Sequence, residues 1–206
     1  MMINRRSFIA AAASGLLLPD GVMAEDTLPV TTIETASAPY PIGKTPPPIW
    51  DLWLVRKETQ QEYKATYVED GQLNVQGYTK VCEALRDIHA PKSQQVVQID
   101  IKLMNLLFAT QQWMKIHNQY RPLIIKSGYR TIERNAKIEN AARNSMHVHG
   151  KAADFTIDGL PTKYLGDFVK WFKEGGVGLY VSDDFVHIDT DRVRYWNGHG
   201  PKKAKV

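Results

Sequence analysis

The sequence predicts an α+β fold in which helices flank a small, mostly antiparallel β-sheet. Two neighbouring segments alternate apolar and polar residues and are rich in aromatic and β-branched side chains, as in a β-hairpin. Three longer segments carry apolar residues at helical spacing, and short apolar runs bounded by turns lie among them. Together these segments predict helices packed on a small, mostly antiparallel sheet.

The predicted hairpin consists of residues 49–57 and 62–71, joined by the polar turn at residues 58–61. The next segment, residues 75–88, has apolar residues three and four apart and predicts a helix. Cys82 lies on the apolar side of this helix. We therefore expect a small buried hydrophobic side chain there rather than a reactive thiol.

Residues 99–119 form the strongest predicted helix, because neither proline nor glycine interrupts the pattern. Its apolar residues are expected on one face, which would belong to the core. They are Leu103, Leu106, Leu107, Trp113 and Met114. The short apolar runs at residues 122–129 and 151–157 predict two buried strands.

The last third of the domain predicts one more helix and two more strands. The helix covers residues 161–176, beginning at Pro161 and ending at paired glycines. Residues 177–181 and 185–189 read as strands on either side of a tight turn.

The first 24 residues are predicted to be an export signal. Arg5 and Arg6 precede a short apolar run, and small or short residues at Val22 and Ala24 follow, as at a cleavage site. The apolar run is too short to span a bilayer, so no stable membrane span is expected after cleavage. The surrounding NRRSFI resembles a twin-arginine signal, which predicts a periplasmic protein.

The remaining chain divides into three predicted parts. Residues 25–48 are rich in proline and small residues and read as a linker. Residues 49–197 form one domain, and residues 198–206 are a basic, disordered tail. We expect the protein to be a monomer.

Charge and cysteine content limit the function classes. The formal net charge is +4, and removal of the signal would leave +3, which suits an anionic envelope but is too small for a nucleic-acid-binding surface. A single cysteine allows no disulfide within the chain, so a core, with or without a metal, must stabilise the fold.

Metal-ligating side chains are concentrated late in the sequence, at His147, His149, Asp154, His187 and Asp189. In the strands predicted at residues 151–157 and 185–189, side chains alternate between the two faces, so the polar donors lie opposite an apolar face. This spacing does not choose between His147 and His149. The structural alternative, a hydrogen-bonded couple of His187 with Asp154 or Asp189, also remains open at this point.

Four motifs in order resemble those of the D-Ala-D-Ala-type zinc metallopeptidases, which belong to the LAS group (lysostaphin, D-Ala-D-Ala metallopeptidase, Sonic hedgehog). Within this group the sequence is most similar to the murein endopeptidase K-type branch, from about Trp50 to Trp196. The motifs are SGYRT, SMHVHGKAADF, GGVGLYV and FVHIDTDRVRYW.

The resemblance implies a LAS-type fold that holds one Zn²⁺ ion. The family pattern S-x-H-x-x-G-x-A-x-D matches Ser145, His147 and Asp154, and the third ligand falls on His187. His149 has no place in this pattern. The resemblance therefore implies His147, Asp154 and His187 as metal ligands.

The resemblance also implies roles for residues around the metal. Arg130 matches the family arginine that stabilises the developing oxyanion. Ser145 matches a residue that contacts substrate or steadies the site. Asp184 stands three residues before the last ligand, where the family has its general base. Asp189 is expected to orient a histidine. Trp196 reads either as a wall of the cleft or as a core residue.

The implied function is a zinc-dependent peptidase that cuts stem-peptide cross-links in peptidoglycan. The alternatives are a DD-carboxypeptidase or dipeptidase, and a catalytically silent zinc-containing module that binds cell wall. The sequence departs from the branch at Ile132, in a short segment covering residues 132–144, and at Asp191, where a glycine is common. The first departure is expected to alter the access of substrate to the site. The second is expected to change the turn after the last ligand strand.

Overall fold

The computed structural model describes residues 49–138, 142 and 144–198. The predicted signal at residues 1–24, the linker at residues 25–48 and the tail beyond residue 198 lie outside the described residues. In the described part of the chain, no helix is long and apolar enough to cross a membrane.

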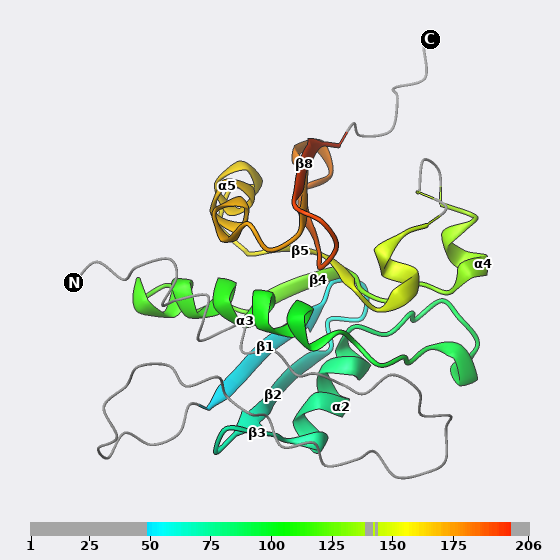
Figure 1. Cartoon of the computed structure of the whole chain (residues 1–206), viewed down its shortest axis with the longest axis horizontal. Helices are drawn as coiled ribbons and strands as arrows, with labels where there is room; N and C mark the ends of the chain where they lie inside the picture. Colours follow the sequence, from blue (N-terminus) through cyan, green and yellow to red (C-terminus); the bar gives the residue numbers. More distant parts are fainter. Residues whose placement is uncertain (1–48, 139–141, 143, 199–206) are drawn as a thin grey trace.

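One eight-stranded sheet runs through the domain in the order β3-β2-β1-β4-β5-β7-β6-β8 (Figure 1). Five of its neighbouring pairs are antiparallel, and two, β1 with β4 and β6 with β8, are parallel. This confirms the predicted α+β fold with a mostly antiparallel sheet. The strands are β1 Trp50–Arg56, β2 Glu62–Glu69, β3 Gln72–Leu73, β4 Leu123–Ser127, β5 Ala152–Thr156, β6 Gly176–Tyr180, β7 Phe185–Asp189 and β8 Arg194–Asn197.

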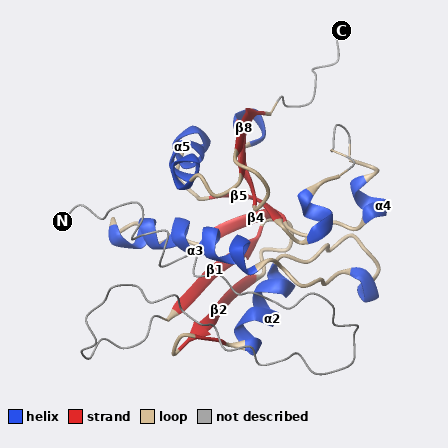
Figure 2. Ribbon diagram, viewed as in Figure 1, coloured by secondary structure: helices blue, strands red, loops and turns tan. Residues whose placement is uncertain are grey.

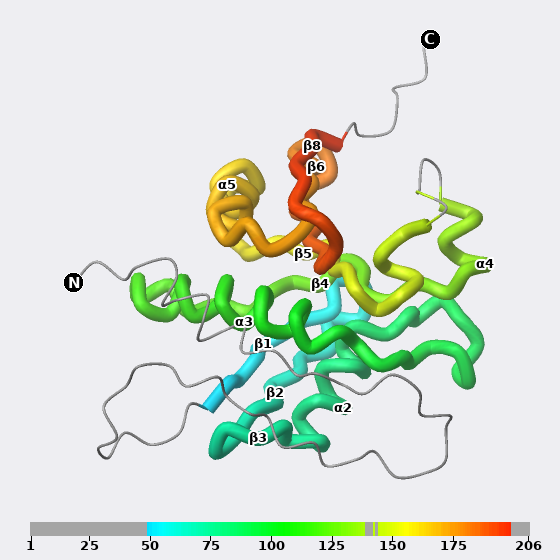
Figure 3. The backbone as a smooth tube through the Cα atoms, viewed as in Figure 1, coloured from blue at the N-terminus to red at the C-terminus, as the bar shows by residue number. Residues whose placement is uncertain are grey.

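The predicted hairpin is present as β1 and β2, and the next helix, α2 (Val75–Ala84), packs against β2. The Asn74 side chain caps α2 by accepting a hydrogen bond from the backbone N–H of Gly77 at 3.0 Å. Cys82 is buried, as predicted. Figure 3 shows that α2, β2 and β3 lie at one end of the sheet, with α5 (Thr162–Phe172), β6 and β8 at the other.

Helix α3 (Ile101–Ile116) lies across the middle of the sheet (Figure 2), and its burial differs from the prediction. Almost every residue from 101 to 111 is buried, so the expectation of a single buried face was wrong. Aromatic contacts explain this: Phe108 stacks on Trp50 of β1, while Trp113 packs against Phe168 of α5. The helix therefore packs on β1 of the sheet and also contacts α5 through Trp113.

The second half of the chain builds the centre of the sheet. The strands predicted at residues 122–129, 151–157, 177–181 and 185–189 are present as β4, β5, β6 and β7, which meet as antiparallel neighbours. Helix α5 ends at Phe172, because Lys173 adopts a left-handed conformation, and not at the paired glycines as predicted.

Several short elements were not predicted from sequence. Strand β3 has only two residues, and half-exposed β8 lacks a continuous apolar side. Both lie at the edges of the sheet. The remaining short elements are α4 (Ile132–Asn135), η1 (Lys92–Gln94), η2 (Met146–His149) and η3 (Val181–Asp183).

Candidate metal centre

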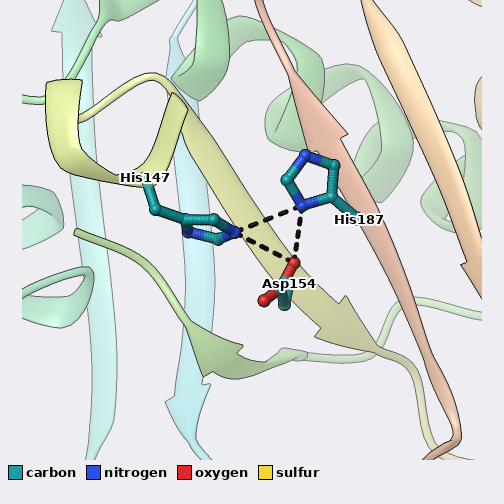
Figure 4. Close-up of side chains that lie close together, drawn as sticks. All are labelled: His147, Asp154 and His187. Atoms are coloured by element: carbon teal, nitrogen blue, oxygen red, sulfur yellow. Dashed lines mark hydrogen bonds and ion pairs between the residues drawn. The ribbon is translucent and has the colours of Figure 1, made fainter. Parts of the chain in front are cut away.

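Three donor side chains from separate elements meet at the middle of the sheet (Figure 4). Asp154 Oδ1 lies 3.2 Å from His147 Nε2 and 2.8 Å from His187 Nδ1. The two imidazole nitrogens lie 3.2 Å apart. These are the residues that the family resemblance implied as ligands, and together they form a candidate metal site.

The sheet register and one tight turn bring these residues together. Asp154 on β5 and His187 on β7 are direct cross-strand partners, so their side chains stand on the same face. His147 lies on η2, which ends at Gly150 in the left-handed region with φ of 64°. A Cβ at Gly150 would also stand 2.6 Å from the carbonyl oxygen of Gln98. Glycine is therefore required where the chain turns from η2 into β5.

His147 is held from its outer side by the backbone. Its Nδ1 lies 2.6 Å from the carbonyl oxygen of Gly128, so Nδ1 carries the proton and donates it. The ring is 2% exposed, and this burial lowers the pKa of His147. A neutral imidazole with its Nε2 lone pair directed at the centre is the form in which histidine binds a metal.

His187 is held in the same way by a carboxylate. Its Nε2 lies 3.1 Å from Asp189 Oδ2, which directs Nδ1 toward the centre. Asp189 is fully buried and accepts further hydrogen bonds from Arg194 and from the backbone N–H groups of Gly176 and Asp191. Burial opposes the charge on Asp189, but these partners outweigh it and lower its pKa to about 2. Asp189 is thus ionised at neutral pH.

Asp154 carries the negative charge of the centre. Burial disfavours the ionised form, but His147 and His187 outweigh that cost and hold the pKa of Asp154 well below its usual range. The same carboxylates act on His187: burial lowers its pKa, whereas hydrogen bonds to Asp154 and Asp189 raise it, and the net shift is upward.

The donor set fits a divalent metal ion. With each imidazole proton on its outer nitrogen, three acceptor atoms face one another, and only a cation or a shared proton can compensate them. The distances between these atoms, 2.8–3.2 Å, are close to the edge of about 3.3 Å expected for a tetrahedron with zinc–nitrogen bonds of ~2.0–2.1 Å.

Arg130 approaches the centre from the SGYRT segment. Its guanidinium Nη2 forms a hydrogen-bonded ion pair with Asp154 Oδ2, and its Nε donates to Ser127 Oγ at 2.8 Å. Its backbone N–H donates to the carbonyl of His147 at 3.2 Å. The arginine implied by the resemblance therefore lies directly against one of the three donor residues.

The other expected site residues lie around the centre without joining it. The Asp184 carboxylate accepts a hydrogen bond from Thr162 Oγ1 at 2.6 Å. Ser145 is half-buried at the start of η2, two residues before His147. His149 is exposed and its Nε2 lies 3.1 Å from Asn144 Oδ1, outside the donor cluster.

The two departures from the family pattern have local structural outcomes. Ile132 is 69% exposed at the first position of α4, where Thr131 caps the helix. Asp191 does not adopt a left-handed backbone conformation, and its N–H donates to Asp189 at 3.0 Å. The turn after β7 therefore does not require a glycine at residue 191. The backbone N–H of Asp191 also helps to hold Asp189, the hydrogen-bond partner of His187.

Trp196, expected either as a wall of the cleft or as a core residue, lies beside the site with its ring 5.3 Å from that of His187, which favours the wall. Other residues at the centre were not anticipated from sequence. The carbonyl of Gly128 holds His147, the guanidinium of Arg194 holds Asp189, and half-buried Lys126 precedes Ser127. The one available signal was the charge at Lys126, which ends the apolar run of its strand.

Comparison with known proteins gives one consistent family. The family described as "Peptidoglycan L,D-endopeptidase MepK" matches residues 47–196. The Escherichia coli (strain K12) protein "Peptidoglycan L,D-endopeptidase MepK" is 29% identical over 197 residues, which cover 94% of this chain and 97% of that protein. A Shigella flexneri protein of the same name matches to the same extent.

A Haemophilus influenzae protein, "Probable peptidoglycan L,D-endopeptidase MepK", is 33% identical over 111 residues. This match covers 52% of the chain and 59% of that relative. No solved structure matches the chain.

Proposed function

Because the chain belongs to the peptidoglycan L,D-endopeptidase MepK family of peptidases, we propose that it is a zinc-dependent endopeptidase that hydrolyses L,D peptide cross-links in peptidoglycan. One observation carries this proposal. His147, Asp154 and His187 direct three acceptor atoms at one point, and the backbone or a carboxylate fixes the outer nitrogen of each histidine.

Zinc is the metal that this donor set fits best. Two imidazoles and one carboxylate, with a fourth position open, are typical of hydrolytic zinc sites. In the proposed enzyme, His147 Nε2, Asp154 Oδ1 and His187 Nδ1 hold a single ion. When bound, zinc would polarise the scissile carbonyl and lower the pKa of a bound water to about 7.

Arg130 is proposed to stabilise the negative charge that develops on the carbonyl oxygen. Its guanidinium already lies at the centre, where it contacts Asp154, and Ser127 fixes its Nε. A planar cation with several N–H donors suits this role, because it can keep one carboxylate contact and donate to the oxyanion.

Asp184 is proposed as the general base. It adopts a left-handed conformation just before β7, which interrupts the strand alternation that would otherwise direct it away from His187. Its Oδ1 accepts the Thr162 hydroxyl, while Oδ2 has no hydrogen-bond partner among the described residues and is free to take a proton. Ser145 is proposed to contact the substrate.

We further propose that residues 1–24 direct export through the twin-arginine route, which would deliver the folded peptidase to the periplasm, where peptidoglycan lies. The paired arginines, the short apolar run and the small residues at the cleavage site support this. One chain supplies all three metal ligands, which supports activity as a monomer.

The test is digestion of purified sacculi with the full chain, followed by separation of the muropeptides. We expect L,D-cross-linked dimers to disappear, chelation to stop the loss, and added zinc to restore it. His187→Ala should be inactive, whereas His149→Ala should match wild type.

Two outcomes would overturn the endopeptidase assignment. Trimming of terminal D-residues with dimers intact would indicate a carboxypeptidase. Full zinc occupancy with unchanged muropeptides would indicate a silent binding module.

A further inference from the structure

A lysine, Lys126, lies on the strand next to the metal centre. It belongs to β4, and the following residue, Ser127, is the cross-strand partner of Asp154. The register between β4 and β5 shifts between Ile125 and Ser127, so Lys126 lies at an irregularity of the sheet. Such irregularities redirect side chains, and they are common beside active sites.

The Lys126 ammonium lies over an aromatic wall formed by Phe185, Tyr180 and Trp196. Its Nζ is 4.4 Å from the centroid of the Phe185 ring, which stacks on Tyr180 at 4.4 Å. The Tyr180 hydroxyl accepts a hydrogen bond from Trp196 Nε1 at 3.2 Å.

This aromatic wall adjoins the metal centre. Phe185 is two residues from His187 on β7, so both side chains share one face of the sheet. Trp196 reaches the same histidine from β8. Lys126, which packs over Phe185, therefore faces the side on which substrate would meet the metal.

The charge of Lys126 is not balanced by a direct partner. Among the described residues, no carboxylate oxygen lies within salt-bridge distance of its Nζ. The Nζ donates one hydrogen bond, to the carbonyl of Asp183 at 2.8 Å. An ammonium has three N–H donors, so this single hydrogen bond leaves it able to donate to a ligand.

Burial lowers the pKa of Lys126, and Lys57 adds to this, while the charges of Asp183, Asp154 and Asp184 oppose it. A half-buried cation that lacks an ion pair costs free energy, and an anionic ligand would recover that cost.

We propose that Lys126 binds a free carboxylate of the substrate, carried by the D-configured carbon next to the scissile nitrogen. This inference rests on the proposed function. In an L,D peptide bond the scissile nitrogen is attached to a D-configured carbon, and hydrolysis releases it as an amine. Within a cross-link that amine belongs to a side chain, so the carboxyl group on the same carbon does not continue the peptide and remains available to a cation.

A charged hydrogen bond of this kind acts mainly on substrate binding. Lys126 contacts a group beside the reacting bond and not the scissile carbonyl, so it would stabilise ground state and transition state alike. We expect its loss to raise KM and to leave kcat nearly unchanged, whereas loss of Arg130 should act on kcat.

The test compares two soluble L,D-cross-linked dimers, one with this carboxyl free and one with it amidated. Wild type should prefer the free carboxylate by about 10- to 100-fold in kcat/KM, the range of a hydrogen bond to a charged group. Lys126→Gln, which keeps a polar side chain but removes the charge, should lose that preference. Lys126→Arg should keep most of it.

Lys80→Gln is the matched control, because it makes the same substitution at an exposed position on α2. It should keep the full preference. Zinc content and thermal melting of each variant establish that the fold is intact.

Two results would overturn the carboxylate site: a wild type that cleaves both dimers equally, or a Lys126→Gln variant that retains the preference. A wild type that cleaves neither dimer while it binds zinc would instead overturn the proposed function, so the two failures are distinct.

Discussion

Asp189 lies 3.1 Å from His187 Nε2 and so directs the other ring nitrogen, Nδ1, to within 2.8 Å of Asp154. The Asp189 carboxylate is itself fixed, because Arg194 donates to both of its oxygens. The orientation of one metal ligand is therefore set by a chain of contacts that reaches from β7 to β8.

The first prediction concerns this chain of contacts. Asp189→Asn replaces the acceptor for His187 Nε2–H with a neutral amide and leaves the Arg194 guanidinium without its charge partner. We expect zinc affinity to fall by about 10- to 100-fold, the usual effect of losing such a hydrogen-bond partner of a ligand. Competition with a chromophoric chelator measures the change.

Asp191→Asn is the control, because the Asp191 side chain is exposed and contacts Arg194 at 3.3 Å without touching His187. Its zinc affinity should match wild type. Equal affinities of Asp189→Asn and wild type would mean that Asp189 does not position His187.

The second prediction separates the two neighbouring histidines. His147 is buried with its Nε2 in the cluster, whereas His149 is exposed and contacts Asn144. We expect His147→Ala to lose stoichiometric zinc and His149→Ala to retain it, as measured by metal analysis of dialysed protein. Retention of zinc by both variants would show that the ion binds elsewhere.

The third prediction concerns Arg130. Removal of one preorganised donor to an oxyanion typically lowers kcat by about 10²- to 10³-fold. We expect Arg130→Gln to show this loss with a smaller change in KM, in steady-state cleavage of a soluble dimer. Its zinc content should stay near one equivalent. Loss of zinc with kcat restored by excess metal would assign Arg130 only to holding Asp154.

The fourth prediction is the pH dependence of stability in the zinc-free protein. The pKa of Asp189 is lowered from 3.8 to about 2 by folding, so its ionised form stabilises the native state above pH 3.8. That contribution is lost as pH falls toward 2. The free energy of unfolding of wild type should therefore exceed that of Asp189→Asn at pH 6, and the difference should shrink in acid.

Urea unfolding at several pH values measures this difference in the presence of chelator. If the difference in free energy of unfolding between wild type and Asp189→Asn grew in acid, the pKa of Asp189 would not be lowered by folding.

Strands with regular apolar patterns were predictable from sequence. FVHID was expected as a strand with His187 and Asp189 on one side, and β7 has these bounds. The two-residue β3 and the half-exposed β8 could not be found, because sheet pairing, and not a local apolar pattern, makes them strands. The burial of α3 on several sides likewise depends on tertiary neighbours such as Trp50 and Phe168.

The metal ligands, too, were only partly predictable from local sequence patterns. Alternation could not choose between His147 and His149, and only the family pattern made that choice. The decisive contact, from His147 Nδ1 to the Gly128 carbonyl, joins residues 19 apart and has no local signal. Lys126 was missed for a related reason, since its aromatic partner Phe185 lies 59 positions later in the chain.

The most direct test of the central claim is a titration of the zinc-free chain with Zn²⁺ while cleavage of a soluble L,D-cross-linked dimer is followed. The rate should rise linearly and level off at one equivalent of zinc, and His187→Ala should stay inactive throughout. Full cleavage by the zinc-free chain, or one bound equivalent of zinc without any cleavage, would contradict the assignment of His147, Asp154 and His187 as the catalytic metal centre.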